Sequence, residues 1–185
     1  MRELALHILD IAENSIEADA GMVEISVIES TAQDRLAICV TDDGKGMDAE
    51  TVARVIDPFV THRTTRKVGL GIPLLKEAAE ACHGSLAIQS APGQGTRLTV
   101  DFQRSHIDRM PLGDLAATFI TLLISHPQTH WKFYYQVDDN AFDFDDAPIK
   151  NELGDIPLTE PAVLSYLKNV LTDGVTQAQA AVPQI

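Results

Sequence analysis

The stretch Thr41-Asp42-Asp43-Gly44-Lys45-Gly46-Met47 decides the expected fold, because it follows an apolar run with the composition of a buried strand. That run is Leu36–Val40, and two carboxylates come directly after it. The two glycines allow a sharp turn and a close approach of the backbone to a bound group. A strand that ends in Asp-Asp-Gly-x-Gly is typical of the floor of a ligand pocket. A solvated turn is the alternative that this stretch alone leaves open.

The composition is that of an ordinary globular protein. The 185 residues, 45% hydrophobic and 22% charged, suit one domain or one domain with a small appendage. A net charge of −13 argues against nucleic acid or an anionic membrane as the main partner. The longest apolar stretch, Leu115–Ile124, is too short to span a bilayer, and Met1–Leu4 has no signal-peptide character. We therefore expect a cytoplasmic protein in which Cys39 and Cys82 are small buried residues.

Hydrophobic periodicity predicts helices and strands along most of the chain. The first part is expected to contain helices over 3–19, 49–56 and 72–82 and strands over 22–29, 36–40, 85–90 and 96–102. The composition then becomes more acidic, and the pattern predicts a helix over 113–125, a hairpin that starts with a strand over 131–137, and a last helix over 160–171. Trp131, Phe133 and Tyr135 alternate along that hairpin and are expected to be core residues.

Polar residues on four separated elements suit a single nucleoside triphosphate. A carboxylate at a strand end, here Asp42, can accept a hydrogen bond from an exocyclic amine such as that of adenine. The Gly69-Leu70-Gly71 stretch at a helix N-terminus offers backbone N–H groups to phosphate. On the first helix, Asn14 can offer a carbonyl oxygen to Mg²⁺, and Asp10, one turn earlier, can orient or deprotonate a water. Gly95-Thr96 is the fourth element.

The order of these motifs resembles that of the GHKL ATPases, a superfamily of gyrase-type topoisomerases, ninety-kilodalton heat-shock chaperones, histidine kinases and mismatch-repair ATPases. The matching stretches are Asp10–Ala18, Asp42–Gly46, the Phe-containing Asp57–Arg63, Gly69–Ile72 and Gly93–Thr96. The Phe-containing stretch is typical of the histidine kinases. The resemblance covers residues 3 to about 103, slightly more than half of the chain.

This resemblance implies the Bergerat ATP-binding fold, an α/β two-layer sandwich with a mixed, mostly antiparallel sheet and helices on one face. We expect an ATP-binding domain over residues 1–104, a small acidic α+β segment over 105–173, and a flexible tail over 174–185.

The resemblance also implies a role for each matching residue. Asp42 would bind adenine, Asn14 would bind Mg²⁺, and Asp10 would be the catalytic carboxylate. The remaining expected nucleotide-binding residues are Gly44, Gly46, Met47, Thr61, Arg63, Gly69, Leu70, Gly71 and Thr96. Asp43 is expected to face solvent or to support the site from outside. The residues left open between surface and site are His7, His62 and Arg66.

Two departures from the family pattern bear on activity. Position 10 is Asp where most hydrolysing members have Glu, which sets the carboxylate back by about 1.5 Å. Histidine kinases place a dimerisation domain with a phosphoacceptor His before this module, whereas the motif here begins within the first ten residues.

The chain therefore resembles stand-alone bacterial ATP-binding proteins, some of them linked to redox enzymes such as hydrogenases. The implied function is to bind Mg-ATP and to hydrolyse it or transfer its γ-phosphoryl group to a separate regulatory protein. One alternative is a nucleotide-sensing switch with negligible turnover, which presents the lid that the resemblance implies over residues 57–70, together with the C-terminal segment, to a partner. The other is an anti-sigma-type serine kinase.

A group of carboxylates in the second hairpin suits either a metal site or a solvated hairpin edge. Its members are Asp138, Asp139, Asp143, Asp145 and Asp146. No glycine or Glu stands where a calcium-binding loop needs one, which favours the solvated edge.

Overall fold

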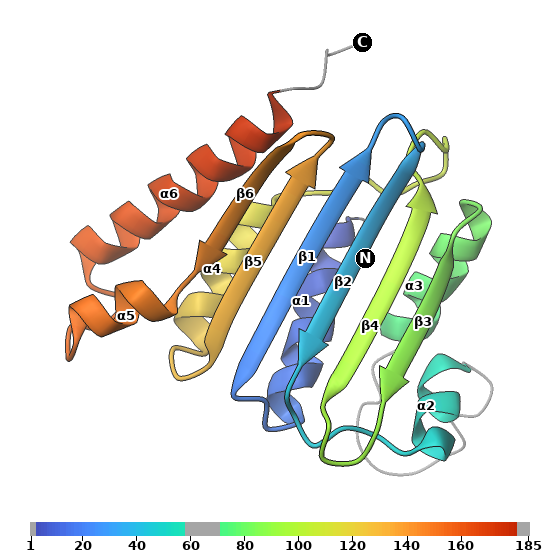
Figure 1. Ribbon diagram of the computed structural model, residues 1–185, viewed down its shortest axis with the longest axis horizontal. Helices are drawn as coiled ribbons and strands as arrows, with labels where there is room; N and C mark the ends of the chain where they lie inside the picture. Colours follow the sequence, from blue (N-terminus) through green and yellow to red (C-terminus); the bar gives the residue numbers. More distant parts are fainter. Residues whose placement is uncertain (1–2, 58–70, 181–185) are drawn as a thin grey trace.

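One six-stranded sheet forms the centre of the molecule, with α1, α3 and α4 on one of its faces (Figure 1). The computed structural model describes residues 3–57 and 71–180. In chain order the elements are α1 (Leu4–Glu17), β1 (Met22–Ser30), β2 (Arg35–Asp42), α2 (Ala49–Ile56), α3 (Gly71–Ala81), β3 (Ser85–Ser90), β4 (Thr96–Gln103), α4 (Leu115–Ser125), β5 (His130–Val137), β6 (Asn140–Asp145), α5 (Ala147–Leu153) and α6 (Pro161–Gln179). This arrangement confirms the expected two-layer α/β fold with a mixed, mostly antiparallel sheet.

The strand order is β3-β4-β2-β1-β5-β6. All neighbouring pairs are antiparallel except β1 and β5, which are parallel, with Met22 opposite His130. β2 therefore lies between β1 and β4, and Asp42 at its end is aligned with Thr96 at the start of β4. This register places two of the predicted site residues side by side.

Local sequence signals explain the elements around the site. The buried residues of α1 include Leu4, Ile8, Ile11 and Ser15, the stripe that the helical period predicts. Helix α2 begins after Asp48, whose side chain accepts a 2.8 Å hydrogen bond from the Thr51 N–H as an N-cap. In the strands, residues on the helix-covered face alternate with residues on the open face, as in β2.

Three aromatic residues of β5 form part of the core, as predicted. Trp131, Phe133 and Tyr135 are each almost completely buried. Phe119 of α4 stacks on Phe133 with ring centroids 4.8 Å apart and meets Trp131 edge to face. Of the two cysteines, Cys82 is buried as expected, whereas Cys39 is only half-buried.

The C-terminal segment continues the sheet of the expected ATP-binding domain. Its strand β5 pairs with β1 from Met22 to Glu29, so the segment is not a separate unit beside the sheet. The last helix is also longer than predicted. Residues 174–179 belong to α6 and not to a tail, because Val175 and Ala178 are buried and Gly174 packs directly against the Phe142 ring. Helix α5 was not predicted, and residues 181–185 lie outside the described ranges.

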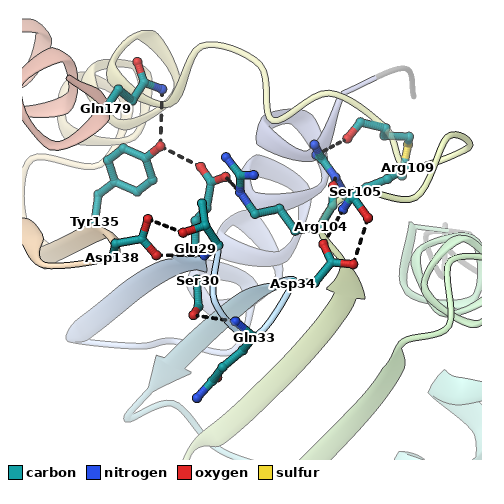
Figure 2. A network of polar contacts seen from close by, with 12 residues as sticks. Glu29, Ser30, Gln33, Asp34, Arg104, Ser105, Arg109, Tyr135, Asp138 and Gln179 are labelled. Carbon is teal, nitrogen blue, oxygen red and sulfur yellow. Dashed lines mark hydrogen bonds and ion pairs between the residues drawn. The ribbon is translucent and has the colours of Figure 1, made fainter. Parts of the chain in front are cut away.

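A polar network connects the C-terminal segment to β1 and to Arg104, which directly follows β4, at the sheet end far from Asp42 (Figure 2). Glu29 accepts a 2.8 Å hydrogen bond from the Tyr135 hydroxyl and pairs with Arg104 at 2.9 Å. The Gln179 amide near the end of α6 donates to the Tyr135 oxygen at 3.3 Å. Burial, together with the Glu29 carboxylate, raises the pKa of Tyr135 far above its ordinary value, so the phenol stays protonated.

Candidate functional site

The carboxylate of Asp42 is fixed by donors from three separate parts of the chain. Its Oδ2 accepts a 2.7 Å hydrogen bond from the Ser15 hydroxyl of α1. Its Oδ1 accepts from the Gly44 N–H at 3.0 Å and from the Thr96 N–H at 3.1 Å. Asp42 is only 8% exposed. A carboxylate has about four lone-pair positions, so these three donors leave one for a further donor.

Glycine is required where the turn after Asp42 meets the β3–β4 hairpin. Gly46 has φ +65°, and a Cβ there would collide with the carbonyl oxygen of Ala91. Gly95 has φ +75°, and a Cβ there would collide with the carbonyl oxygen of Asp42. The two backbone segments therefore pack directly against each other, which fixes the position of Asp42.

A cavity of about 450 Å³ opens beside this turn. Five predicted site residues are among its lining residues: Asn14, Asp42, Gly46, Met47 and Thr96. Six apolar side chains also line it: Ile11, Val40, Val55, Ile72, Ile88 and Leu98. Ser15, Glu17, Ala18, Lys45 and Thr51 complete the lining. A mostly apolar cavity of this size with a buried carboxylate suits a flat, apolar ring system that carries a hydrogen-bond donor.

A second cavity of about 470 Å³ lies in the C-terminal segment, and it contains none of the predicted site residues. Its lining runs from Ile124 and Pro127 through Lys150 to the connection between α5 and α6. The cavity at Asp42 is therefore the candidate site, although the other is slightly larger.

The other predicted site residues fall into three groups. Gly44 does not line the cavity and contributes its N–H to Asp42. Asp10 and Gly71 also lie outside the lining set; Asp10 is half-buried on α1 and Gly71 is buried at the start of α3. Four of them, together with His62 and Arg66, lie outside the described residues: Thr61, Arg63, Gly69 and Leu70.

His7 is a buried residue of α1, with a side chain only 3% exposed. His7 is therefore not a surface residue, one of the two alternatives that the sequence left open for it. Burial lowers the pKa of His7, and the nearby N-terminal charge lowers it further, while the Asp10 carboxylate and a hydrogen bond to the Gly71 backbone act in the opposite direction. His7 therefore connects α1 to the start of α3 as a neutral side chain.

Two further side chains, Ser15 and Asp43, hold the site in place from outside the predicted set of nucleotide-binding residues. Ser15 directly follows Asn14 and is the donor to Asp42 from α1, and its only sequence signal was a hydroxyl within the apolar stripe. Asp43 is exposed, and its Oδ1 accepts from the N–H groups of Gly21 and Met22, both at 2.8 Å. Asp43 thus holds the start of β1 against the turn, which agrees with a supporting role outside the cavity.

Comparison with known proteins gives consistent matches over this half of the chain. Residues 2–106 match the family model described as "Histidine kinase-, DNA gyrase B-, and HSP90-like ATPase". The sensor protein kinase FleS of Pseudomonas aeruginosa is 39% identical over 93 residues, or 50% of this chain and 23% of that protein. The heme sensor protein HssS of Staphylococcus saprophyticus is 32% identical over 85 residues, or 45% of this chain and 18% of that protein. The chain thus spans less than a quarter of the length of either relative.

Among solved structures, the Aquifex aeolicus MutL ATPase domain complexed with ADP is similar in fold. Its TM-score is 0.52 at 14% identity, with 73% of this chain and 60% of that chain covered. In the part of the chain that the structure describes, no helix combines the length and the hydrophobicity needed to cross a membrane.

Proposed function

This chain belongs to the family of histidine kinase-, DNA gyrase B- and HSP90-like ATPases, and on that premise we propose that it binds Mg-ATP and either hydrolyses it or transfers the γ-phosphoryl group to a separate protein. The observation that carries the proposal is the carboxylate of Asp42, fixed by three donors at the wall of a largely apolar cavity.

Asp42 suits the adenine end of the nucleotide. It is an acceptor with one free lone-pair position, so it favours a base edge that donates a hydrogen bond, as the amino group of adenine does. Apolar side chains such as Val40, Ile88 and Leu98 line the same cavity and suit contact with the faces of the ring. A base that presents a carbonyl oxygen at this position would meet the carboxylate with two acceptors facing each other and would bind more weakly.

Asn14 and Asp10 suit the phosphate end. Asn14 is exposed on α1 and lines the cavity, and its amide oxygen is a hard donor of the kind that Mg²⁺ prefers. The bound ion would neutralise phosphate charge and orient the γ-phosphoryl group. Asp10 lies one helical turn before Asn14 on the same helix, and its carboxylate is the candidate acceptor for a proton of an attacking nucleophile.

The position of Asp10 also favours a second candidate function, a nucleotide-sensing switch with little turnover. Asp10 lies outside the residues that line the cavity and is one bond shorter than Glu. In this alternative, bound ATP would present the lid and the C-terminal segment to a protein partner.

Binding and turnover measured on matched variants separate these functions. Isothermal titration of Mg-ATP should give at least ~10-fold weaker binding for Asp42→Asn, because hydrogen bonds to charged groups contribute about 1.5–3 kcal/mol. Asp139→Asn makes the same charge change on the exposed β5–β6 turn and should bind normally. Equal affinity of both variants would exclude the assignment of Asp42.

The second measurement is phosphate release, with and without Asp10→Asn. If the chain is an ATPase, this variant should keep its ATP affinity and lose turnover. ATP binding without any release or transfer in either protein would favour the switch.

A further inference from the structure

Three side chains with metal-binding atoms meet where β5 begins and β6 ends. They are His130, the first residue of β5, Asp145, the last residue of β6, and Asp146, the N-cap residue of α5. The His130 Nε2 lies 2.8 Å from Asp145 Oδ1 and 3.9 Å from Asp146 Oδ1, and the three donor atoms all lie within 4.8 Å of one another. The group is independent of the nucleotide cavity, since none of its members lines that cavity.

The three residues differ in how far they are exposed to solvent. Asp146 is only 2% exposed, and its Oδ2 forms an ion pair with the Lys150 ammonium, 2.6 Å away. Its Oδ1 accepts from the Trp131 N–H at 3.0 Å and faces His130. The His130 and Asp145 side chains are both about a third exposed, which gives an ion access from solvent.

We propose that His130, Asp145 and Asp146 bind a divalent transition-metal ion of the Zn²⁺ class. One imidazole and two carboxylates are a common ligand set for such ions, with water at the remaining position. Ligands that each lie about 2.0–2.2 Å from one tetrahedral Zn²⁺ are about 3.3–3.6 Å apart, and the separations of 2.8 and 3.9 Å from the His130 Nε2 lie on either side of that range. The hydrogen bond between His130 and Asp145 gives way to two metal bonds when the ion enters.

Two lysines beside the site, Lys132 and Lys150, determine which metal ions it prefers. Lys150 pairs with Asp146 and Lys132 lies 3.7 Å from Asp145 Oδ2, so both carboxylates are already partly neutralised. Attraction of a hard cation by charge alone is therefore weak, and the imidazole nitrogen contributes a larger share of the binding. This favours Zn²⁺, Ni²⁺ or Co²⁺ over Mg²⁺ or Ca²⁺.

Zinc titration of the full chain against a chromogenic chelator tests the site. The wild-type protein should bind one Zn²⁺, and His130→Gln and Asp145→Asn should each weaken binding by at least ~10-fold. His106→Gln is the matched control, because His106 lies in the connection after β4 and should not affect zinc binding. Lys150→Met should tighten binding, because it releases Asp146 from its ammonium partner.

The Co²⁺-loaded protein supplies a readout that does not depend on protein stability. Visible absorption of a low-symmetry Co²⁺ complex should appear in the wild type and disappear in His130→Gln, while circular dichroism of the apo-proteins remains the same. Equal zinc affinity of the wild type and His130→Gln, or weaker binding in a folded Lys150→Met variant, would show that the cluster is an ion-pair network only.

Discussion

Replacing Ser15 by Ala removes one of the three donors to Asp42 and should affect both stability and ATP binding. The Ser15 hydroxyl lies 2.7 Å from Asp42 Oδ2, and both residues are buried. The other two donors, Gly44 and Thr96, bond to Oδ1, so Asp42 Oδ2 would lose the donor that holds it to α1.

The change in the free energy of unfolding is the loss of a charge-assisted hydrogen bond, partly offset by the higher helix propensity of Ala. A hydrogen bond to a charged group contributes about 1.5–3 kcal/mol. Ala is a better helix former than Ser by about 0.5 kcal/mol within α1, which offsets part of the loss. The net destabilisation should be about 1–2.5 kcal/mol, which for a chain of this size lowers Tm by roughly 2–10 °C.

Mg-ATP binding by Ser15→Ala should be weaker by roughly 3–10-fold, because the carboxylate is held less firmly by its two remaining N–H donors. Urea unfolding and isothermal titration measure the two effects on the same preparation. Ser26→Ala is the matched control, because Ser26 lies in the middle of β1, away from the cavity lining. A Ser15→Ala variant with wild-type stability and wild-type affinity would refute the idea that this hydroxyl fixes Asp42.

Three further predictions concern other parts of the described structure. Tyr135→Phe removes the hydroxyl that donates to Glu29 and should lower the free energy of unfolding by about 1–2 kcal/mol in urea titrations. Gly46→Ala forces a Cβ into backbone atoms at positive φ and should destabilise the protein and weaken ATP binding, whereas Gly93→Ala, whose Cβ would meet nothing within 4 Å, should cost only about 1 kcal/mol. Stability should fall as pH drops below about 6.5, because the unfolded chain protonates His7 while the folded chain resists it, and His7→Met should flatten this dependence between pH 7.5 and 5.5.

Each of these has a result that would contradict it. An unchanged urea midpoint for Tyr135→Phe would mean that the hydroxyl is equally well satisfied by water. If Gly46→Ala and Gly93→Ala lower the stability of the protein equally, the close packing of the turn at Gly46 is unimportant for stability. If the free energy of unfolding of His7→Met still falls with decreasing pH, groups other than His7 cause the dependence.

Short-range signals predicted the parts of the fold that they control. The Asp48 cap predicts the start of α2, and the turn residues 91–95 predict the β3–β4 hairpin, because each depends on neighbouring residues only. The family motifs led to Asn14, Asp42 and Thr96, and the structure places all three at one cavity. Their chemical roles stay predictions.

Long-range packing explains what the sequence did not predict. The last helix continues past its expected end at residue 171, because Gly174 allows α6 to approach Phe142 of β6, a contact between residues far apart in sequence. His130 was not connected with Asp145 and Asp146 because only the pairing of β5 with β6 brings them together. The hydrogen bond from Ser15 to Asp42 was not predicted, because a helical period does not distinguish a buried hydroxyl with a partner from a small apolar residue.

The parallel pairing of β1 with β5 has a consequence for how the chain folds. More than a hundred residues separate Met22 from His130, so the centre of the sheet can close only after most of the chain has been synthesised. Until then β1 has one unpaired edge, although the ATPase motifs, which all precede β5 in the sequence, are complete. A ribosome-bound chain that ends near residue 106 should therefore depend on chaperones or associate through β1, whereas release of the full chain lets β5 close the edge from within.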